Sequence, residues 1–372
     1  MVIANLYLDN IYSFDDFTLN LTYPKKIVNS TIENECLKDF KNFRFKKLNI
    51  LLGSNATGKT SLGMAIWHIC MFMSRKEADH LIKMVCNKNR EAKIVFDYII
   101  EKGKLNRIDI VIKPVLNENN KVLIRYNSID LNKNDSYESA VKRISEKDYV
   151  NYVEGLTYIE FKGWKFVFPL TEANFDRVIS PYDDEKDKEE FLNILIPILK
   201  TLDPLIKNVS ISQEIQRTYI IEVAKGEKFF VSHGMKLSEI PILSSGTKYG
   251  FNIASILFDI KKHQNRFYFV DEQFSYINSE IEIALLNLMV NYLGEDEQLF
   301  FTSHNSELLA LNYPAHSFTF LRKVKKNESL QIEAIDASFY EKRNNVNLKN
   351  LYDNDFFNVS PDLSQLYNLW EE

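Results

Sequence analysis

The chain has 372 residues, of which 45% are hydrophobic and 26% charged, and its net charge at pH 7 is −5. This is the composition of a folded globular protein, long enough for one large core or two modest ones. The acidic balance and the lack of a Lys/Arg block argue against an obligate nucleic-acid partner. No run approaches about 18 apolar residues, and no basic segment precedes an apolar one at the start, so we expect no membrane span and no secretion signal.

The cysteines indicate the compartment. Cys36, Cys70 and Cys86 do not have the spacing of a zinc site. An odd number of cysteines is typical of a protein kept in a reducing environment. We therefore expect a cytoplasmic protein.

The first residues predict two strands and an irregular excursion. Apolar and polar residues alternate in Val2–Leu8 and in Phe17–Tyr23, with a turn expected at Ser13–Asp16. Pro24–Asn42 is polar and has no clear periodicity, so we expect it to run over the surface.

The next stretch contains the first motif that carries chemistry. Leu48–Leu52 predicts a buried strand, residues 53–60 fit G-x-x-x-x-G-K-[ST], and Ser61–Cys70 continues with apolar residues at helical spacing. Strand, glycine loop and helix in this order predict a phosphate-binding P-loop, in which backbone N–H groups and the helix N-terminus face the anion. Lys59 can then reach the β- and γ-phosphates, and the Thr60 hydroxyl can bind Mg²⁺.

The following residues predict structural elements. Helices are expected at Lys76–Cys86 and at Glu189–Leu202. The second helix begins within a charged run, Asp183–Glu190, which we interpret as a solvated loop or first helical turn. Strands are expected at Lys93–Ile100, Arg107–Ile112, Val122–Tyr126, Val209–Ile215, Thr218–Val223 and Lys228–Val231.

One short motif in this region points to a different nucleotide. Asn132-Lys-Asn-Asp135 matches the guanine-reading N-K-x-D sequence of GTPases. The chain is rich in Asn and Lys, and no D-x-x-G lies between the P-loop and this point. We interpret the match as chance.

The second half of the chain contains a serine-rich helix start. Leu243-Ser-Ser-Gly-Thr-Lys248 opens an amphipathic helix. Its apolar side would carry Phe251, Ile253, Ile256, Leu257 and Ile260. Hydroxyls and unsatisfied N–H groups at such a helix start can hold an anion, although a serine N-cap alone would explain the pattern.

Two buried strands then end in chemistry-bearing residues. Arg266–Val270 predicts a strand that delivers Asp271 and Glu272 at its carboxyl end, a Walker B arrangement in which the first carboxylate binds Mg²⁺ and the second polarises a water molecule. A helix is expected at Ile281–Tyr292. The strand Gln298–Phe301 follows and ends in Thr302-Ser-His304, whose histidine we interpret as a γ-phosphate sensor.

P-loop, Leu-Ser-Ser-Gly helix, Asp-Glu pair and strand-tip histidine, in this order, resemble an ABC-class ATPase head of the SMC and RecF kind. No sustained heptads separate the halves, so the resemblance is to a head-only member. The closer resemblance is to the AAA-fifteen group of AAA family ATP-binding proteins, found in abortive-infection and other phage-defence operons. It is carried by LSSGTK, by the meander after the P-loop helix, and by a tail in which Arg343-Asn-Asn and Leu351-Tyr352 echo the group's pattern without its glycines.

The resemblance covers nearly the whole chain and implies its fold. The expected class is α/β: a P-loop NTPase with an ABC-type ATPase head, a mixed central sheet, an antiparallel β lobe and a helical insertion. We expect one domain over residues 1–372. Its parts would be an N-terminal half with the P-loop and the β meander at 1–115, a variable insertion or lid at 120–235, a signature, Walker B and His-switch half at 236–335, and a tail at 336–372.

The resemblance also implies a role for each motif residue. Glu272 would be the general base, His304 would sense the γ-phosphate, and Lys59 would bridge the β- and γ-phosphates. Thr60 and Asp271 would hold Mg²⁺. Asn278 falls where such heads usually carry Asp or His in the D-loop. The triphosphate would be bound by Gly53, Ser54, Asn55, Ala56, Thr57, Gly58, Lys59, Thr60 and Ser61, and capped from a second subunit by Ser244, Ser245 and Gly246.

The function implied is ATP-dependent engagement of two protomers, with Mg²⁺-dependent hydrolysis of ATP to ADP and phosphate resetting the switch. A homodimer or higher homo-oligomer is expected. It would sense phage infection and control a separately encoded effector, a nuclease or a toxin. The main alternative is a RecF- or SMC-like DNA-binding ATPase in DNA repair or maintenance.

A third possibility is a self-contained nuclease. Asp353-Asn-Asp355 has the form of a D-x-D metal pair. Only 68 residues follow His304, and several of them should complete the ATPase sheet. We therefore interpret the pair as part of a loop.

Overall fold

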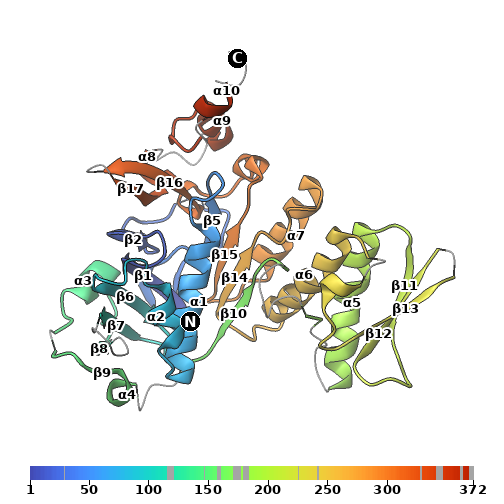
Figure 1. Ribbon diagram of the computed structural model, residues 1–372, viewed down its shortest axis with the longest axis horizontal. Helices are drawn as coiled ribbons and strands as arrows, with labels where there is room; N and C mark the ends of the chain where they lie inside the picture. The colour runs from blue at the N-terminus through green and yellow to red at the C-terminus, as the bar shows by residue number, and fades with distance from the viewer. Residues whose placement is uncertain are drawn as a thin grey trace. The chain divides into compact units, whose positions relative to one another are not determined.

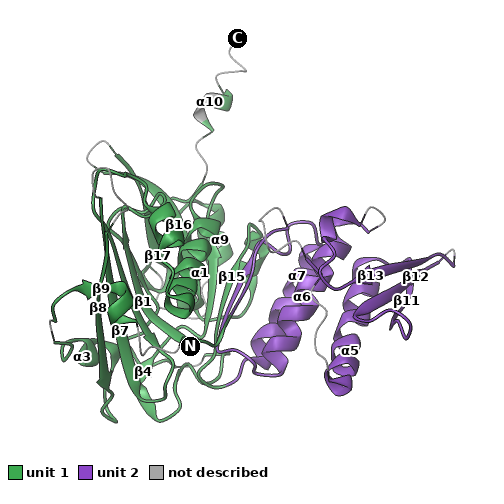
Figure 2. Cartoon of the chain, turned by 60° about the horizontal axis from the view of Figure 1, so that its bottom comes forward, with its two compact units in different colours: residues 1–164, 295–372 green, residues 165–294 purple. Residues whose placement is uncertain are grey.

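The computed structural model describes residues 1–28, 30–114, 121–145, 147–156, 161–170, 177–178, 184–224, 226–240, 243–326, 329–340, 347–360 and 363–367. The chain divides into two units (Figure 2): Met1–Trp164 with Glu295–Glu372, and Lys165–Gly294. Asp183 and Arg343-Asn-Asn lie outside the described residues.

The first unit contains a six-stranded antiparallel sheet with the order β2-β1-β6-β7-β8-β9 (Figure 1). The expected hairpin and meander are confirmed, but two of the meander strands are about twice as long as predicted, because backbone pairing continues where the apolar pattern stops. The strands are β1 (Val2–Asp9), β2 (Phe17–Asn20), β6 (Ala92–Ile99), β7 (Lys104–Lys113), β8 (Lys121–Asp130) and β9 (Val150–Asn151).

A buried charged group joins two strands of this sheet to a short helix. Asp97 in β6 lies opposite Arg107 in β7, whose Nε and Nη2 each donate to the Asp97 carboxylate at 2.6 Å. Tyr137, the first residue of α3 (Tyr137–Val141), donates its hydroxyl to the same carboxylate at 2.5 Å. Burial and the nearby Asp97 charge raise the pKa of Tyr137, so the hydroxyl remains a donor.

This group gives a prediction about stability. Arg107→Ala is expected to lower the free energy of unfolding by about 3–5 kcal/mol, because it leaves a buried carboxylate without its cation. Urea unfolding would measure the loss. As a control, Lys102→Ala removes an exposed ion pair with Asp39 and should leave the unfolding midpoint unchanged. Equal effects of the two substitutions would contradict the prediction.

The second sheet of this unit carries the strand that precedes the P-loop. β5 (Leu48–Leu52) lies between β15 (Gln298–Thr302) and β16 (Phe318–Lys326) and is parallel to both. β17 (Ser329–Asp336) pairs antiparallel with β16, so the expected mixed sheet is confirmed. Every residue of β5 and β15 is buried, which explains why apolar residues occupy most positions of both strands and do not alternate with exposed ones. The sequence did not predict β16 and β17 as strands.

Other elements of the first unit depart from the predictions. The region expected to be irregular, Pro24–Asn42, contains β3 (Cys36–Leu37) and most of β4 (Phe40–Arg44), which pair antiparallel. The helix predicted at Lys76–Cys86 is shorter in the structure, where α2 spans Asp79–Met84. The remaining helical segments are α1 (Lys59–Arg75), α4 (Tyr152–Gly155), α8 (Ala337–Tyr340), α9 (Leu348–Asp353), α10 (Ser364–Tyr367), η2 (Ser306–Ala310) and η3 (Ala315–Ser317).

The second unit is organised around three helices, α5 (Glu185–Leu202), α6 (Ser245–Lys261) and α7 (Ser279–Tyr292). α5 and α6 approach closely at Gly250, where an added Cβ would lie 2.8 Å from Leu199 Cδ2. A three-stranded antiparallel sheet has the order β11-β12-β13. The strands and short helix of this unit are β10 (Trp164–Val167), β11 (Ile206–Ile211), β12 (Thr218–Val223), β13 (Lys228–Ser232), β14 (Phe267–Asp271) and η1 (Leu237–Glu239).

Within the described part of the chain, no helix combines the length and the apolar character that crossing a lipid bilayer requires.

Candidate functional site

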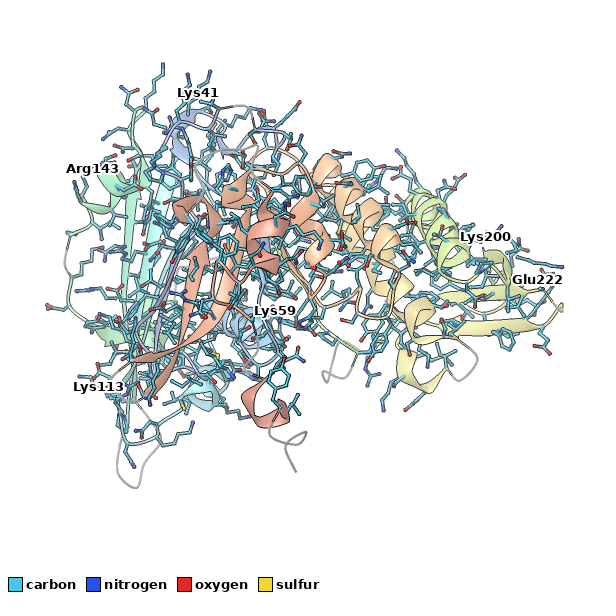
Figure 3. All side chains as sticks on the ribbon, turned by 90° about the horizontal axis from the view of Figure 1, so that it is seen from above. Lys41, Lys59, Lys113, Arg143, Lys200 and Glu222 are labelled. Carbon is cyan, nitrogen blue, oxygen red and sulfur yellow. The ribbon has the colours of Figure 1, made fainter. Side chains whose placement is uncertain are left out.

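The P-loop follows β5 and leads directly into α1. Lys59, labelled in Figure 3, is only 4% exposed, and its Nζ donates to the Gly53 carbonyl at 3.0 Å and to the Ser54 carbonyl at 3.4 Å. Thr57 donates its hydroxyl to the same Ser54 carbonyl at 2.8 Å. The loop therefore wraps around the Lys59 amino group. A bound phosphate would compete with the two carbonyls for this group.

The start of α1 suits an anion. Gly58 is the N-cap residue, with φ of 92°, and contributes no side-chain cap to the first-turn N–H groups. No acidic residue lies in the first turn. The first-turn N–H groups and the positive end of the helix dipole therefore face no negative side chain of this turn, as phosphate binding requires.

Contacts from distant parts of the sequence shape the loop. An added Cβ on Gly53 would lie 2.5 Å from the backbone oxygen of Leu321 in β16, and one on Gly58 would lie 3.0 Å from Ile332 and 3.1 Å from Phe14. The loop is thus packed between β16, β17 and the turn after β1. Sequence reasoning missed all three contacts, because nothing local to the P-loop signals them.

The contact at Gly53 predicts a sensitivity to one methyl group. Gly53→Ala is expected to weaken nucleotide binding at least about tenfold, because moving the loop away from Leu321 misaligns N–H groups that bind a charged ligand. Titration with a fluorescent ATP analogue would measure this. Gly234→Ala is the control: Gly234 also has a positive φ, but an added Cβ would meet nothing within 4 Å. Similar losses from both variants would show that the collision is not the cause.

His304 lies in the first unit, close to the end of the P-loop strand. Thr302, the last residue of β15, is in register with Leu51 of β5, and the next N–H, that of Ser303, donates to the Leu51 carbonyl at 3.3 Å. His304 follows and is exposed. Parallel strands end at the same edge of a sheet, so this unit brings the histidine and the P-loop to one edge.

The two carboxylates predicted to form a Walker B pair lie in the second unit, at the end of β14. Asp271 is fully buried, and Glu272 has a positive φ of 46° that turns the chain as the strand ends. Gln273 is also fully buried; its Nε2 donates to the Asp271 carbonyl at 2.9 Å and its Oε1 accepts from Asn252 of α6 at 3.3 Å. Sequence reasoning assigned Gln273 no role, whereas its amide links the backbone just before Glu272 to α6.

The serine-rich helix start and the D-loop lie together in the second unit. Ser244 is the N-cap of α6 and accepts from the Thr247 N–H at 3.1 Å, so the N-cap interpretation is correct for this residue. Ser244 and Ser245 are both exposed. An added Cβ on Gly246 would lie 3.1 Å from the Tyr276 carbonyl, which places the segment just before Asn278 against the helix start.

Asn278 is the N-cap of α7. Its Oδ1 accepts a hydrogen bond from the Glu280 N–H at 2.7 Å, so the side-chain oxygen already has a partner in the first turn of the helix. A contact to nucleotide would therefore use its amide nitrogen.

The two motifs interpreted as accidental have local structural roles. The Asp135 carboxylate accepts from the Asn132 N–H at 2.7 Å and pairs with Arg143, so the N-K-x-D sequence forms a turn before α3. Asp353 pairs with Lys349 at 2.8 Å, and Asp355 accepts from backbone N–H groups of residues 359 and 360. Among the described residues, no three His, Cys, Asp or Glu side chains are grouped as metal ligands.

Comparison with solved structures shows the fold. The head of Smc bound to the C-terminal winged-helix domain of ScpA matches with a TM-score of 0.52 and 13% identity, covering 91% of this chain and all of that one. The SMC head domain from Thermotoga maritima has a TM-score of 0.46 and 14% identity, covering 90% and 99%. The recombination mediator protein named as RecF-ATPrS in the RecFOR pathway has a TM-score of 0.40 and 11% identity, covering 89% of this chain and 98% of that one. The fold assignment rests on the first.

No protein in the comparison with curated sequences matches this chain. A family model does match, over residues 48–310, from the P-loop strand to η2. Its description differs from that of the AAA-fifteen group named from the sequence, but it is the description of an AAA domain, and the fold agrees with the expected ATPase head of SMC type. The chain belongs to the family described as "AAA domain, putative AbiEii toxin, Type IV TA system".

Proposed function

We propose that this protein binds ATP at the P-loop, hydrolyses it to ADP and phosphate, and uses the cycle as a switch. The observation that carries the proposal is the P-loop itself: a buried lysine enclosed by the loop at the start of a helix whose first turn contains no acid. Membership in an AAA family supports the choice of nucleotide. The buried Asp271 followed by Glu272 supports hydrolysis.

The residues have distinct tasks in this proposal. Lys59 exchanges its contacts with the Gly53 and Ser54 carbonyls for contacts with phosphate oxygens. Thr60 and Asp271 offer oxygen ligands of the kind that Mg²⁺ prefers, and a bound Mg²⁺ would neutralise phosphate charge. Glu272 orients a water molecule and accepts its proton. His304 contacts the γ-phosphate.

The exposed helix start of α6 completes the site in trans. Ser244, Ser245 and Gly246 of one copy would cap the γ-phosphate held by the P-loop of another, with Asn278 beside them. ATP would thus join two protomers, and hydrolysis would release them. The Smc head is named with a bound ScpA domain, and we propose by analogy that this chain also controls a separately encoded protein.

The proposed setting is antiviral defence, in which the controlled protein is a toxic effector and phage infection is the trigger. The family description, with its AbiEii toxin, supports this setting. The alternative is a DNA-binding ATPase of the RecF and SMC type. One observation favours it: Lys323 and Lys325 are both exposed near the end of β16 and could meet phosphate groups.

Two measurements on the purified chain test the proposal. Phosphate release should require both ATP and Mg²⁺, and ATP should displace a fluorescent ATP analogue at lower concentration than GTP does. Absence of turnover and of nucleotide binding would end the proposal. Duplex DNA binding that weakens steeply with salt would favour the alternative setting, and Lys323→Ala with Lys325→Ala should then reduce the salt slope by about two.

A further inference from the structure

Glu272 has a backbone conformation that a glutamate rarely adopts. Its φ of 46° lies in the left-handed region, where Cβ crowds the backbone of every residue except glycine. A side-chain-bearing residue persists in this region only where its surroundings compensate for the strain. The neighbours of Glu272 must therefore supply contacts that keep the proposed general base in this conformation.

Two side chains supply such contacts, one on each side of Glu272. Gln273 donates its Nε2 to the Asp271 carbonyl at 2.9 Å, so its amide closes a ring across Glu272. The Ser275 hydroxyl donates to the Glu272 carbonyl at 3.1 Å. The φ and ψ angles of Glu272 set the relation between these two rigid peptide planes. Because each plane has a side-chain partner, the two hydrogen bonds together hold the left-handed conformation.

The amide of Gln273 is itself held by α6. Its Oε1 accepts from the Asn252 Nδ2 at 3.3 Å, and the two side chains are only 0% and 6% exposed. An amide oxygen can only accept and an amide nitrogen can only donate. The bond from Asn252 therefore determines which end of the Gln273 amide faces the Asp271 carbonyl.

Asn252 belongs to a side of α6 that contacts the chain after β14. Gly246, Tyr249 and Asn252 are spaced three residues apart and share one side of the helix. An added Cβ on Gly246 would lie 3.1 Å from the Tyr276 carbonyl, and the rings of Tyr249 and Tyr276 stack with their centroids 5.8 Å apart. α6 thus contacts residues 273–276 over nearly two turns, beginning at its exposed start.

We propose that Gln273 and Ser275 are positioning residues for ATP hydrolysis: they hold Glu272 in its left-handed conformation, and Asn252 ties Gln273 to α6. The proposal rests on the proposed function, in which Glu272 is the base and the start of α6 contacts nucleotide. Both residues act through Glu272. They should therefore affect the rate of the chemical step and not the affinity for nucleotide.

Steady-state turnover tests this role. Gln273→Met keeps the length and the approximate volume of the side chain but removes both of its hydrogen bonds. Turnover at saturating ATP is expected to fall about 10- to 100-fold, because a misplaced base loses part of the effect of general-base catalysis. The affinity for a fluorescent ATP analogue should stay within about twofold of the wild type.

Gln298→Met is the matched control. Gln298 is also fully buried, and its amide also donates to backbone carbonyls, those of Ile3 and Lys46. The control is expected to lower the free energy of unfolding, measured in urea, yet to keep turnover within about threefold, because none of its bonds involves the backbone beside Glu272. Equal losses of turnover in the two variants would overturn the proposal.

A double-mutant cycle separates positioning from a general loss of activity. If Gln273 acts through Glu272, adding Gln273→Met to Glu272→Gln should lower the residual turnover by less than about twofold. Full additivity of the two losses would overturn the proposal, because Gln273 would then affect turnover without the base.

Ser275→Ala tests the same role without disturbing the core. Ser275 is exposed, and the substitution removes its bond to the Glu272 carbonyl. Turnover should fall about three- to tenfold, the effect of one hydrogen bond, with unchanged nucleotide affinity. Ser329→Ala is the control, because the exposed Ser329 also donates to the carbonyl three residues earlier, at 2.9 Å, and it should leave turnover unchanged.

The outcomes distinguish this proposal from the proposed function. If Gln273→Met does not fold, the result with Ser275→Ala decides. A wild-type chain without turnover would end the proposed function, and this proposal with it. Wild-type turnover that persists unchanged in the folded Gln273→Met and Ser275→Ala variants would overturn the positioning role alone.

Discussion

Lys59→Ala is expected to abolish measurable nucleotide binding. The Lys59 amino group is buried in the P-loop and held by the Gly53 and Ser54 carbonyls, so the substitution removes the cation around which the loop is built. Hydrogen bonds to charged groups contribute about 1.5–3 kcal/mol each, and the loss of two of them weakens binding by about 100-fold or more. The thermal shift that Mg-ATP produces in the wild-type chain should disappear.

A matched substitution separates this effect from a general loss of lysine charge. Lys83 is exposed on α2, away from the loop, and Lys83→Ala should keep the full thermal shift. A Lys59→Ala chain that still shows the wild-type shift would contradict the assignment of the P-loop. Urea unfolding without nucleotide would establish that the variant is folded, as the comparison requires.

Glu272→Gln is expected to stop hydrolysis without stopping binding. The substitution preserves the shape and the left-handed backbone of Glu272 but removes the carboxylate that would accept the proton of water. General-base catalysis contributes about 10²–10⁴-fold, and phosphate release should fall by that factor. Because ATP persists, the variant should accumulate as an ATP-bound assembly that elutes earlier in size exclusion than the nucleotide-free chain.

The control for this prediction is Glu280→Gln, the same chemical change at an exposed residue of α7. It should leave turnover within about twofold of the wild type, as ordinary surface substitutions do. If Glu272→Gln loses turnover but elutes with Mg-ATP as it does without nucleotide, the proposed joining of two protomers is contradicted. If it retains turnover, Glu272 is not the base.

The two variants together distinguish binding from chemistry. Lys59→Ala should lose the thermal shift, the turnover and the assembly, whereas Glu272→Gln should lose only the turnover. Urea unfolding of both variants would show whether a shared loss of the thermal shift reflects a loss of fold.

Much of the fold could be predicted where the signal is local. The range of β5 agrees with the prediction residue for residue, and α6, α7, β14 and β15 differ from it by only a few residues at their ends. Buried strands appear as short apolar runs and helices as a 3.6-residue periodicity, and both signals are visible in a short window. β16 and β17 were missed because charged and polar residues follow or interrupt their short apolar stretches.

The sequence by itself determined the identity and order of the nucleotide motifs, because each motif is a short run whose residue types indicate its chemistry. Only the tertiary structure decided what holds them: Leu321 against Gly53, Phe14 and Ile332 against Gly58, and Gln273 joining β14 to α6. Such contacts join residues that lie up to hundreds of positions apart in the chain. Because a local pattern contains no record of which distant backbone will approach it, this packing becomes known only when the chain is folded.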